Sequence, residues 1–262
     1  MKTRSSWQVT CAVWHAMFMR EIVARTMKDR MAWFWMLAEP IAMISLMLLI
    51  RTIVLGRSNM LYNAEFVPWL IVGLLGFFLF RENMTRSIGA VDANKTLFSY
   101  RQVKPVDAVL VRCFLESTLK SFIFLLFIAA GVLLDLKLLP DLPLEAMFVW
   151  LSLWMFGLGI GLLLSVASGL VPEIGTVARI MAIPLLLLSG VIIPITMLPT
   201  FLHPYILMNP IVHGVETLRM SFFERYVTLP EIDLMYMWYW TLTMMALGLM
   251  LHIRFEMRLK EA

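Results

Sequence analysis

The sequence has little charge, little cysteine and none of the short motifs that mark common catalytic or phosphate-binding sites. Charged residues make up 15% of its 262 positions, against about 25% in soluble domains. The two cysteines, Cys11 and Cys113, form no metal spacing, and the four histidines are scattered, so no metal site is expected. No G-x-x-x-x-G-K-[ST], G-x-S-x-G or H-E-x-x-H occurs. We therefore expect no catalytic residues, and any energy for function must come from another chain or from an ion gradient.

Apolar residues are present in excess, at 61% of the chain, and they form long runs. A bilayer core of roughly 30 Å is crossed by about 20 apolar helical residues. The runs predict an all-α membrane protein with a transmembrane domain over residues 31–254. Its six spans are expected at residues 31–55, 66–87, 109–134, 146–171, 176–194 and 234–253. Residues 1–30 and 255–262 are expected to be a cytoplasmic N-terminus and a cytoplasmic tail.

The N-terminal segment is expected to be an amphipathic helix. Its apolar positions recur with helical spacing at Trp7, Cys11, Trp14, Phe18 and Ile22. Basic residues follow at Arg20, Arg25, Lys28 and Arg30. Tryptophan together with basic residues is typical of a helix that lies in the membrane interface. The alternative is a cytosolic helix packed against the bundle.

Lysine and arginine are concentrated in the N-terminal segment, the loop after the second span and the C-terminal tail. With the N-terminus inside, all three segments fall on the same side of the membrane. The positive-inside rule therefore predicts that both termini are cytoplasmic.

The inner loop of residues 92–107 mixes apolar and basic side chains. Residues 93–101 can form a short helix that Pro105 would end. Leu97, Phe98 and Tyr100 lie there among Lys95, Arg101 and Lys104. Such a surface fits a docking site for a cytosolic partner, and equally an ordinary basic loop.

The proline-rich segment of residues 194–230 is too interrupted to form a full span. Irregular backbone at membrane depth is tolerated where protein or water covers it. Two short helices that dip back toward the bilayer satisfy this condition, and a surface hairpin that caps the bundle is the alternative.

The chain resembles ABC-2 type transport permeases, most closely the permeases of group 2 capsular polysaccharide exporters of the polysialic-acid type. The likeness covers the amphipathic helix, six spans and the inner loop that ends in Val103-Lys104-Pro105-Val106-Asp107. It also covers the run from Ser189-Gly190-Val191-Ile192-Ile193-Pro194 to Asn209-Pro210, with Glu216 and Arg219. This last run is the more specific part.

The resemblance implies a homodimer in the bacterial inner membrane, bound to two copies of a cytosolic ABC ATPase that holds ATP and Mg²⁺. It implies export of a lipid-linked polysaccharide, with a periplasmic co-polymerase and an outer-membrane export protein as further partners. It makes the loop between the second and third spans a cytoplasmic coupling helix, and residues 194–226 short periplasmic re-entrant helices. The coupling residues would be Asn94, Lys95, Thr96, Leu97, Phe98, Tyr100, Arg101 and Lys104.

A sugar chain needs weak, repeated contacts along its path. Candidates for lining it are Arg51, Trp69, Phe77, Phe78, Lys120, Trp154, Glu216 and Arg219. The aromatic residues among them can equally be a lipid-facing belt or packed core. Arg51 lies about 18 Å along the helix from Glu39, and it either snorkels to the surface or meets an anionic sugar or Glu216.

Charged residues also occur on the third span and at the inner interface. On the third span, Arg112, Glu116 and Lys120 recur at i, i+4 and i+8, so ion pairs along one helix face are expected. We expect Arg112 to extend toward the cytosol and Lys120 to be buried. At the inner interface, Arg25, Lys28 and Arg30 would receive the phosphate of a lipid-linked substrate.

Other functions compete with this interpretation. An exporter of O-antigen, another glycoconjugate or a drug would have the same architecture. A secondary transporter would favour internal repeats and charged sites at mid-membrane, but the two halves show no repeat and the fourth and sixth spans carry no charge. A membrane enzyme acting on glycosyl lipids would need clustered acidic or basic groups near one face, and none stands out.

Overall fold

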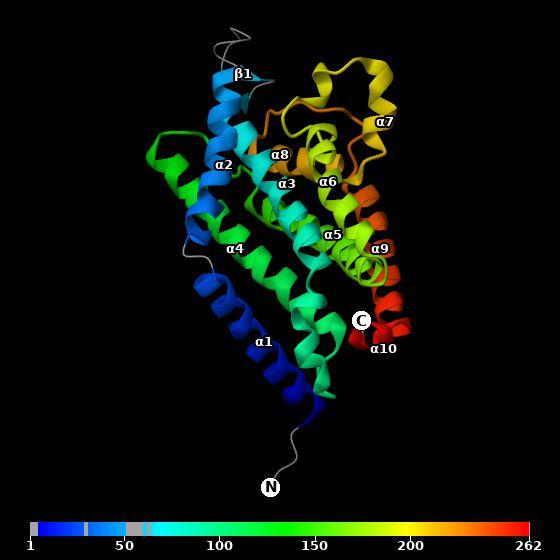
Figure 1. Ribbon diagram of the computed structural model, residues 1–262. Helices are drawn as coiled ribbons and strands as arrows, with labels where there is room; N and C mark the ends of the chain where they lie inside the picture. Colours follow the sequence, from blue (N-terminus) through cyan, green and yellow to red (C-terminus); the bar gives the residue numbers. More distant parts are fainter. Residues whose placement is uncertain (1–4, 29–30, 51–59, 62–63, 262) are drawn as a thin grey trace.

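The computed structural model describes residues 5–28, 31–50, 60–61 and 64–261. As predicted, nearly all of this is helical (Figure 1). One small antiparallel hairpin is the exception, formed by β1 (Met60–Leu61) and β2 (Ala64–Glu65). The longer helices are α1 (Ser6–Lys28), α2 (Ala32–Leu49), α3 (Phe66–Ile88), α4 (Pro105–Leu133), α5 (Pro143–Leu170), α6 (Pro172–Leu188) and α9 (Leu234–Arg254). The shorter ones are η2 (Asp92–Ser99), η3 (Ile195–Met197), η4 (Thr200–Leu202), α7 (His203–Leu207), α8 (Pro210–Phe222) and α10 (Glu256–Glu261).

Proline sets the start of four helices. Pro105, Pro143, Pro172 and Pro210 each occupy a first helical position, where the missing N–H costs nothing and the fixed φ favours a helix. Side chains complete two of these starts. The backbone N–H of Lys104 donates to Asp107 Oδ2 at 2.9 Å, and Asn209 Oδ1 accepts from the backbone N–H of Ile211 at 3.1 Å.

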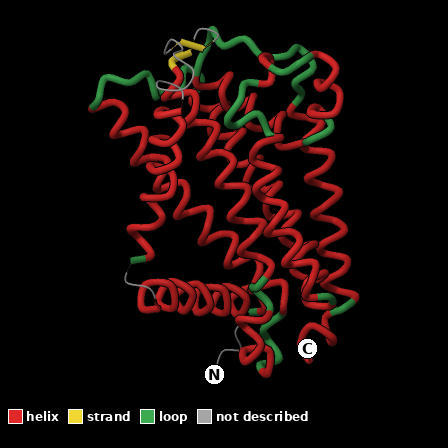
Figure 2. The backbone as a smooth tube through the Cα atoms, turned by 45° about the horizontal axis from the view of Figure 1, so that its top comes forward, coloured by secondary structure: helices red, strands yellow, loops and turns green. Residues whose placement is uncertain are grey.

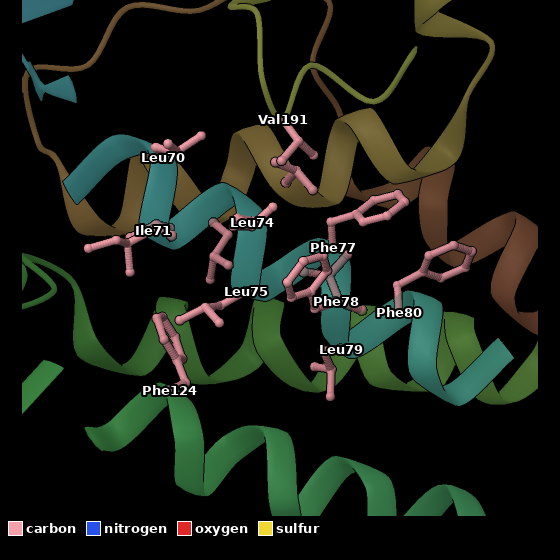
Figure 3. Packing of buried hydrophobic residues seen from close by; sticks show 14 of the residues in the cluster. Leu70, Ile71, Leu74, Leu75, Phe77, Phe78, Leu79, Phe80, Phe124 and Val191 are labelled. Carbon is pink, nitrogen blue, oxygen red and sulfur yellow. The ribbon is translucent and has the colours of Figure 1, made fainter. Parts of the chain in front are cut away.

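Helix α3 forms the centre of the bundle. In its most apolar 18-residue stretch, 89% of the residues are buried. It packs against α4, α5 and α8. Its apolar side chains point outward in several directions, and Phe124 from α4 and Val191 from the segment after α6 close around them (Figure 3). An apolar helix that is buried all round, rather than on one stripe, is the expected centre of a membrane-type core.

Close helix packing depends on the glycine-rich run in α5. A Cβ on Gly157 would lie 2.9 Å from the carbonyl oxygen of Phe80, and one on Gly161 would lie 2.5 Å from Ser87 Oγ, both on α3. Between these two, Gly159 faces Thr241 and Met245 on α9. The small residues therefore let α5 approach two helices at once, in agreement with the close approach that small residues permit.

Four of the described helices are long and apolar enough to cross a membrane: α3, α4, α5 and α9. The first and fifth predicted spans correspond to the shorter helices α2 and α6. The part of the first predicted span beyond residue 50 lies outside the described residues. Four of the six expected spans thus correspond to described helices that are long and apolar enough to cross a membrane.

The two ends of the bundle carry different helices and strands. Figure 2 shows α1 lying across one end, and η2 and α10 are at this same end. The β-hairpin, α7 and the connections around α8 occupy the other end (Figure 1). Both described termini of the chain therefore lie at the end that carries η2.

Candidate functional sites

The first candidate site is the loop around η2, whose residues divide into two sets. Asn94 and Phe98 are buried, at 3% and 7% exposure. Lys95 and Leu97 are half-buried. The exposed members of the predicted coupling set are Thr96, Tyr100, Arg101 and Lys104. The buried side chains can only hold the loop in place, so a partner protein would touch the exposed ones.

A hydrogen bond from α1 anchors the buried set. The Asn94 amide donates through Nδ2 to the carbonyl oxygen of Ala90 at 2.7 Å, and its Oδ1 accepts from Arg20 Nη2. A hydrogen bond that involves a charged group is stronger than a neutral one. The Arg20 side chain therefore ties η2 to the N-terminal helix.

Two more polar contacts join α1 to α4. Trp14 Nε1 donates to Asp107 Oδ1 at 2.8 Å, and the other oxygen of that carboxylate caps the start of α4. Arg112 and Glu21 form an ion pair at 2.7 Å, with side chains 14% and 21% exposed. Burial reduces solvent screening of such a pair. Helix α1, η2 and the start of α4 thus form one connected unit.

A hydrophobic cluster lies beneath this unit. Its buried members include Met17 from α1, Phe98 from η2 and Leu259 from α10. Elements from both described ends of the chain therefore support the loop. On α1, the predicted apolar stripe is divided: Trp7 is 72% exposed, whereas Trp14 and Phe18 contact α4. Met17, which is off that stripe, is buried in the cluster.

The second candidate site is a fully buried ion pair at the opposite end. Arg219 Nη1 contacts Glu216 Oε1 at 2.6 Å, and neither side chain has any exposed surface. Arg219 also donates to the carbonyl oxygens of Gly190 and Val191 at 2.8 and 2.9 Å. Gly190 has a φ of +67°, a conformation that favours glycine.

Both oxygens of the Glu216 carboxylate have hydrogen-bond partners. Its Oε2 accepts hydrogen bonds from Tyr226 at 2.9 Å and from Thr228 at 2.6 Å. Burial raises the pKa of Tyr226, and the Glu216 charge beside it acts in the same direction. A buried charge is tolerated where its hydrogen bonds are made. This cluster therefore joins α8 to the segments on either side of it.

The third candidate site is a chain of charges between α2, α3 and α4. Arg81 Nη2 contacts Glu39 Oε1 on α2 and Glu82 Oε1 on its own helix, each at 2.6 Å. Glu82 also contacts Arg86 at 3.1 Å, and Arg86 in turn lies 3.9 Å from Glu116 on α4. Charges within apolar helices are costly and mark functional sites by default.

The sequence matches the model of a known protein family over most of its length. The model of the ABC-2 type transporter family matches residues 12–223, from α1 to the end of α8. The chain belongs to the ABC-2 type transporter family. The resemblance seen in the sequence is thereby confirmed.

Named relatives within the ABC-2 family align with nearly the whole chain. The polysialic acid transport protein KpsM of Escherichia coli is 31% identical over 249 residues, 95% of each chain. The capsule polysaccharide export inner-membrane protein CtrC of Neisseria meningitidis serogroup A is 29% identical over 92% of this chain and 90% of its own length. The corresponding protein BexB of Haemophilus influenzae is 25% identical over 84% of this chain and 82% of its own.

The aromatic residues proposed from sequence to line a path lie in the packed core of this ABC-2 chain. Trp69, Phe77 and Phe78 are at most 1% exposed, and Trp154 is half-buried. Figure 3 shows Phe77 and Phe78 among the apolar side chains of α3. Within a single copy, these rings contact protein rather than an open path.

The basic residues proposed from sequence are only partly described. Arg30 and Arg51 lie outside the described residues, and so do the side chains of Arg25 and Lys28 in α1. Lys120 is 4% exposed, as expected for a buried position. The ion pairs that the spacing along α4 permits do not form, because Arg112 pairs with Glu21 and Lys120 forms no ion pair with any described residue.

Sequence reasoning missed the importance of Arg81 and Glu82. The signal was present, since both charges directly follow the uncharged stretch at the start of α3. It also missed the pairing of Trp14 with Asp107. The contacts of Arg81 with Glu39 and of Trp14 with Asp107 join different helices, and periodicity within one helix does not identify them. The Glu82–Arg86 pair, in contrast, has the i, i+4 spacing of a single helix.

Proposed function

We propose that this chain is the permease subunit of an ATP-driven exporter that moves a lipid-linked capsular polysaccharide across the bacterial inner membrane. The observation that carries the proposal is the alignment with KpsM, at 31% identity over 95% of both chains. CtrC and BexB, which bear the names of capsule export proteins, support the same cargo class.

In this proposal the chain crosses the membrane six times, through α2, α3, α4, α5, α6 and α9. Both termini are cytoplasmic, α1 lies at the inner interface and residues 255–262 form the tail. The short helices between α6 and α9 dip toward the bilayer from the periplasmic side. The common end of the described termini and the lengths of α3, α4, α5 and α9 support this topology.

The energy would come from a separate ABC ATPase that binds ATP and Mg²⁺, with two ATPases on a permease homodimer. The exposed surface of the η2 loop, carried by Tyr100 and Arg101, would receive the ATPase. Its connections to α1 and α4 would carry the resulting movement into the bundle, since a rigid unit transmits a push better than a free loop.

The remaining roles concern cargo. Arg25, Lys28 and Arg30 would bind the phosphate of the lipid anchor at the inner interface, because basic side chains there attract anionic groups. A periplasmic co-polymerase and an outer-membrane export protein would take the polysaccharide onward from the permease.

Deletion of the gene in its own host tests the proposal. Surface polysaccharide should be lost, and the wild-type gene should restore it. An Arg101→Glu variant should fail to restore it and should no longer co-elute with the separate ABC ATPase, since the substitution reverses a charge on the docking surface. Lys137→Glu, an equal change at an exposed position in the connection from α4 to α5, is the matched control. Normal surface polysaccharide in the deletion strain would refute the proposed function.

A further inference from the structure

Glu39 has a setting unlike that of the other acids in the charged chain between α2, α3 and α4. Its side chain is 43% exposed, whereas those of Glu82 and Glu116 are 10% and 3% exposed. It lies within an apolar helix. A carboxylate that faced lipid here would be strongly unfavourable. The ion pair with Arg81 offsets this cost on one side of the carboxylate, and its other side is open in a single copy of the chain.

The cations behind Glu39 are buried more deeply. Arg81 is 20% exposed, and Lys120 is 4% exposed. Both lie over the ring of Phe78, with Arg81 Cζ 4.3 Å and Lys120 Nζ 5.5 Å from the ring centroid. Lys120 makes no hydrogen bond or ion pair with the described residues. A buried ammonium with no ion-pair partner among the described residues is costly, and a nearby anion would lower that cost.

Counted over the described residues, the charges of the cluster balance while Glu39 is present. The cluster contains the acids Glu39, Glu82 and Glu116 and the cations Arg81, Arg86 and Lys120. Loss of the Glu39 contact leaves one uncompensated positive charge beside Arg81. Arg81 would keep its contact with Glu82, and its guanidinium would have free donors of the geometry that carboxylates and phosphates prefer.

Helix α2 contains a proline next to Glu39. Pro40 follows it directly within the helix. Proline cannot donate the helical hydrogen bond, and helices bend at such positions. The contact that joins Glu39 to α3 thus lies beside a turn of α2 that lacks one backbone hydrogen bond.

We propose that Arg81 and Lys120 form a binding site for the anionic group of an acidic glycan, and that Glu39 occupies this site until an arriving anion displaces it. The site rests on the proposed function, since a polysaccharide exporter supplies such a ligand. The glycan's carboxylate would contact Arg81 from the exposed face of α2, and the charge of the cluster would return to zero. Each sugar would bind weakly, because Glu39 competes for the same guanidinium.

Binding to the purified full-length chain in phosphatidylcholine nanodiscs tests the site. The probes are a fluorescent α2,8-linked sialic acid oligomer and a neutral maltooligosaccharide of matched length. Glu39→Gln should bind the acidic probe about tenfold more tightly than the wild type, as for a site otherwise open in about one molecule in ten. Neutral binding should not change. Glu173→Gln, which removes an exposed carboxylate from α6, is the matched control and should bind like the wild type.

Two double variants keep the charge balance and so guard against misfolding. Glu39→Gln combined with Arg81→Gln should lose the gain in affinity, and so should Glu39→Gln combined with Lys120→Gln. Wild-type affinity in Glu39→Gln would overturn the inference, as would a gain that persists in both double variants. If added phosphatidylglycerol abolishes the gain, the site takes lipid phosphate and the assignment to a glycan is wrong.

The outcome is separable from that of the proposed function. If the gene restores surface polysaccharide and Glu39→Gln shows no gain, only the anion site fails. If the predicted binding pattern is found and deletion of the gene leaves surface polysaccharide intact, the proposed function fails instead.

Discussion

The guanidinium of Arg219 lies over the ring of Trp69, with its Cζ 3.6 Å from the ring centroid, and both side chains are completely buried. Trp69 is near the start of α3, and Arg219 is on α8. A desolvated arginine stacked on tryptophan contributes about 2 kcal/mol or more. This contact therefore fixes the short helix α8 to the central helix of the bundle.

The position of the Arg219 side chain against α3 requires a glycine on that helix. A Cβ on Gly73 would lie 2.1 Å from Arg219 Nη2, so Gly73→Ala must displace the buried guanidinium. We expect a loss of about 1–3 kcal/mol of stability, seen as a lower thermal unfolding midpoint in detergent. Gly89→Ala is the matched control, because no atom lies within 4 Å of its added Cβ. Equal midpoints for the two variants would contradict the packing described.

The Glu216–Arg219 pair should be more sensitive to loss of one partner than to loss of both. Glu216→Gln leaves the Arg219 charge buried without its counter-ion, at a cost of about 3–5 kcal/mol. Glu216→Gln combined with Arg219→Met removes both charges, so part of the stability should return. Thermal unfolding of the wild type, both single variants and the double variant measures the coupling. Strictly additive losses would show that the two charges do not interact.

The Arg20–Asn94 contact should control the order of the η2 loop. Arg20→Met removes a charged hydrogen bond, a change of about 1.5–3 kcal/mol, while keeping much of the apolar stem. Trypsin should then cleave faster at Lys95 and Arg101, since local opening exposes the backbone. Mass spectrometry of the fragments gives the rates. Arg179→Met, at an exposed position on α6, should leave them unchanged, and unchanged rates in Arg20→Met would contradict the anchoring role.

The two cysteines should differ in reactivity. Cys11 on α1 is exposed, and Cys113 on α4 is 1% exposed. With a cytoplasmic N-terminus, a membrane-impermeant maleimide should label Cys11 in inside-out vesicles and not in right-side-out vesicles. Cys11→Ser should abolish the labelling, since burial protects the other thiol. Labelling from the periplasmic side would reverse the proposed orientation.

Much of the fold could be predicted from local features. The apolar runs predict helices at α3, α4, α5 and α9, and proline marks where α4 and α8 begin. The run from Gly157 to Gly161 predicts close packing, although not that alternate glycines face α3 and α9. These features are readable because each depends on neighbours within the same helix.

The candidate sites could be predicted only in part. The residues of the η2 loop are found by composition, but their division into buried Asn94 and exposed Arg101 depends on where α1 lies. Likewise, Trp69 and Phe78 have the composition of a sugar path and are buried in the core. Aromatic rings serve either role, and the helices packed around them decide which.

The sequence by itself determined that this protein is helical, is solvated by lipid over much of its length and belongs with ABC-2 permeases, because run lengths and short motifs are properties of consecutive residues. Only the tertiary structure decided which charges pair between different helices. Arg81 meets Glu39 and Arg112 meets Glu21 across distances of 42 and 91 positions in the chain. The spacing within one helix contains no information about which face of another helix will lie against it.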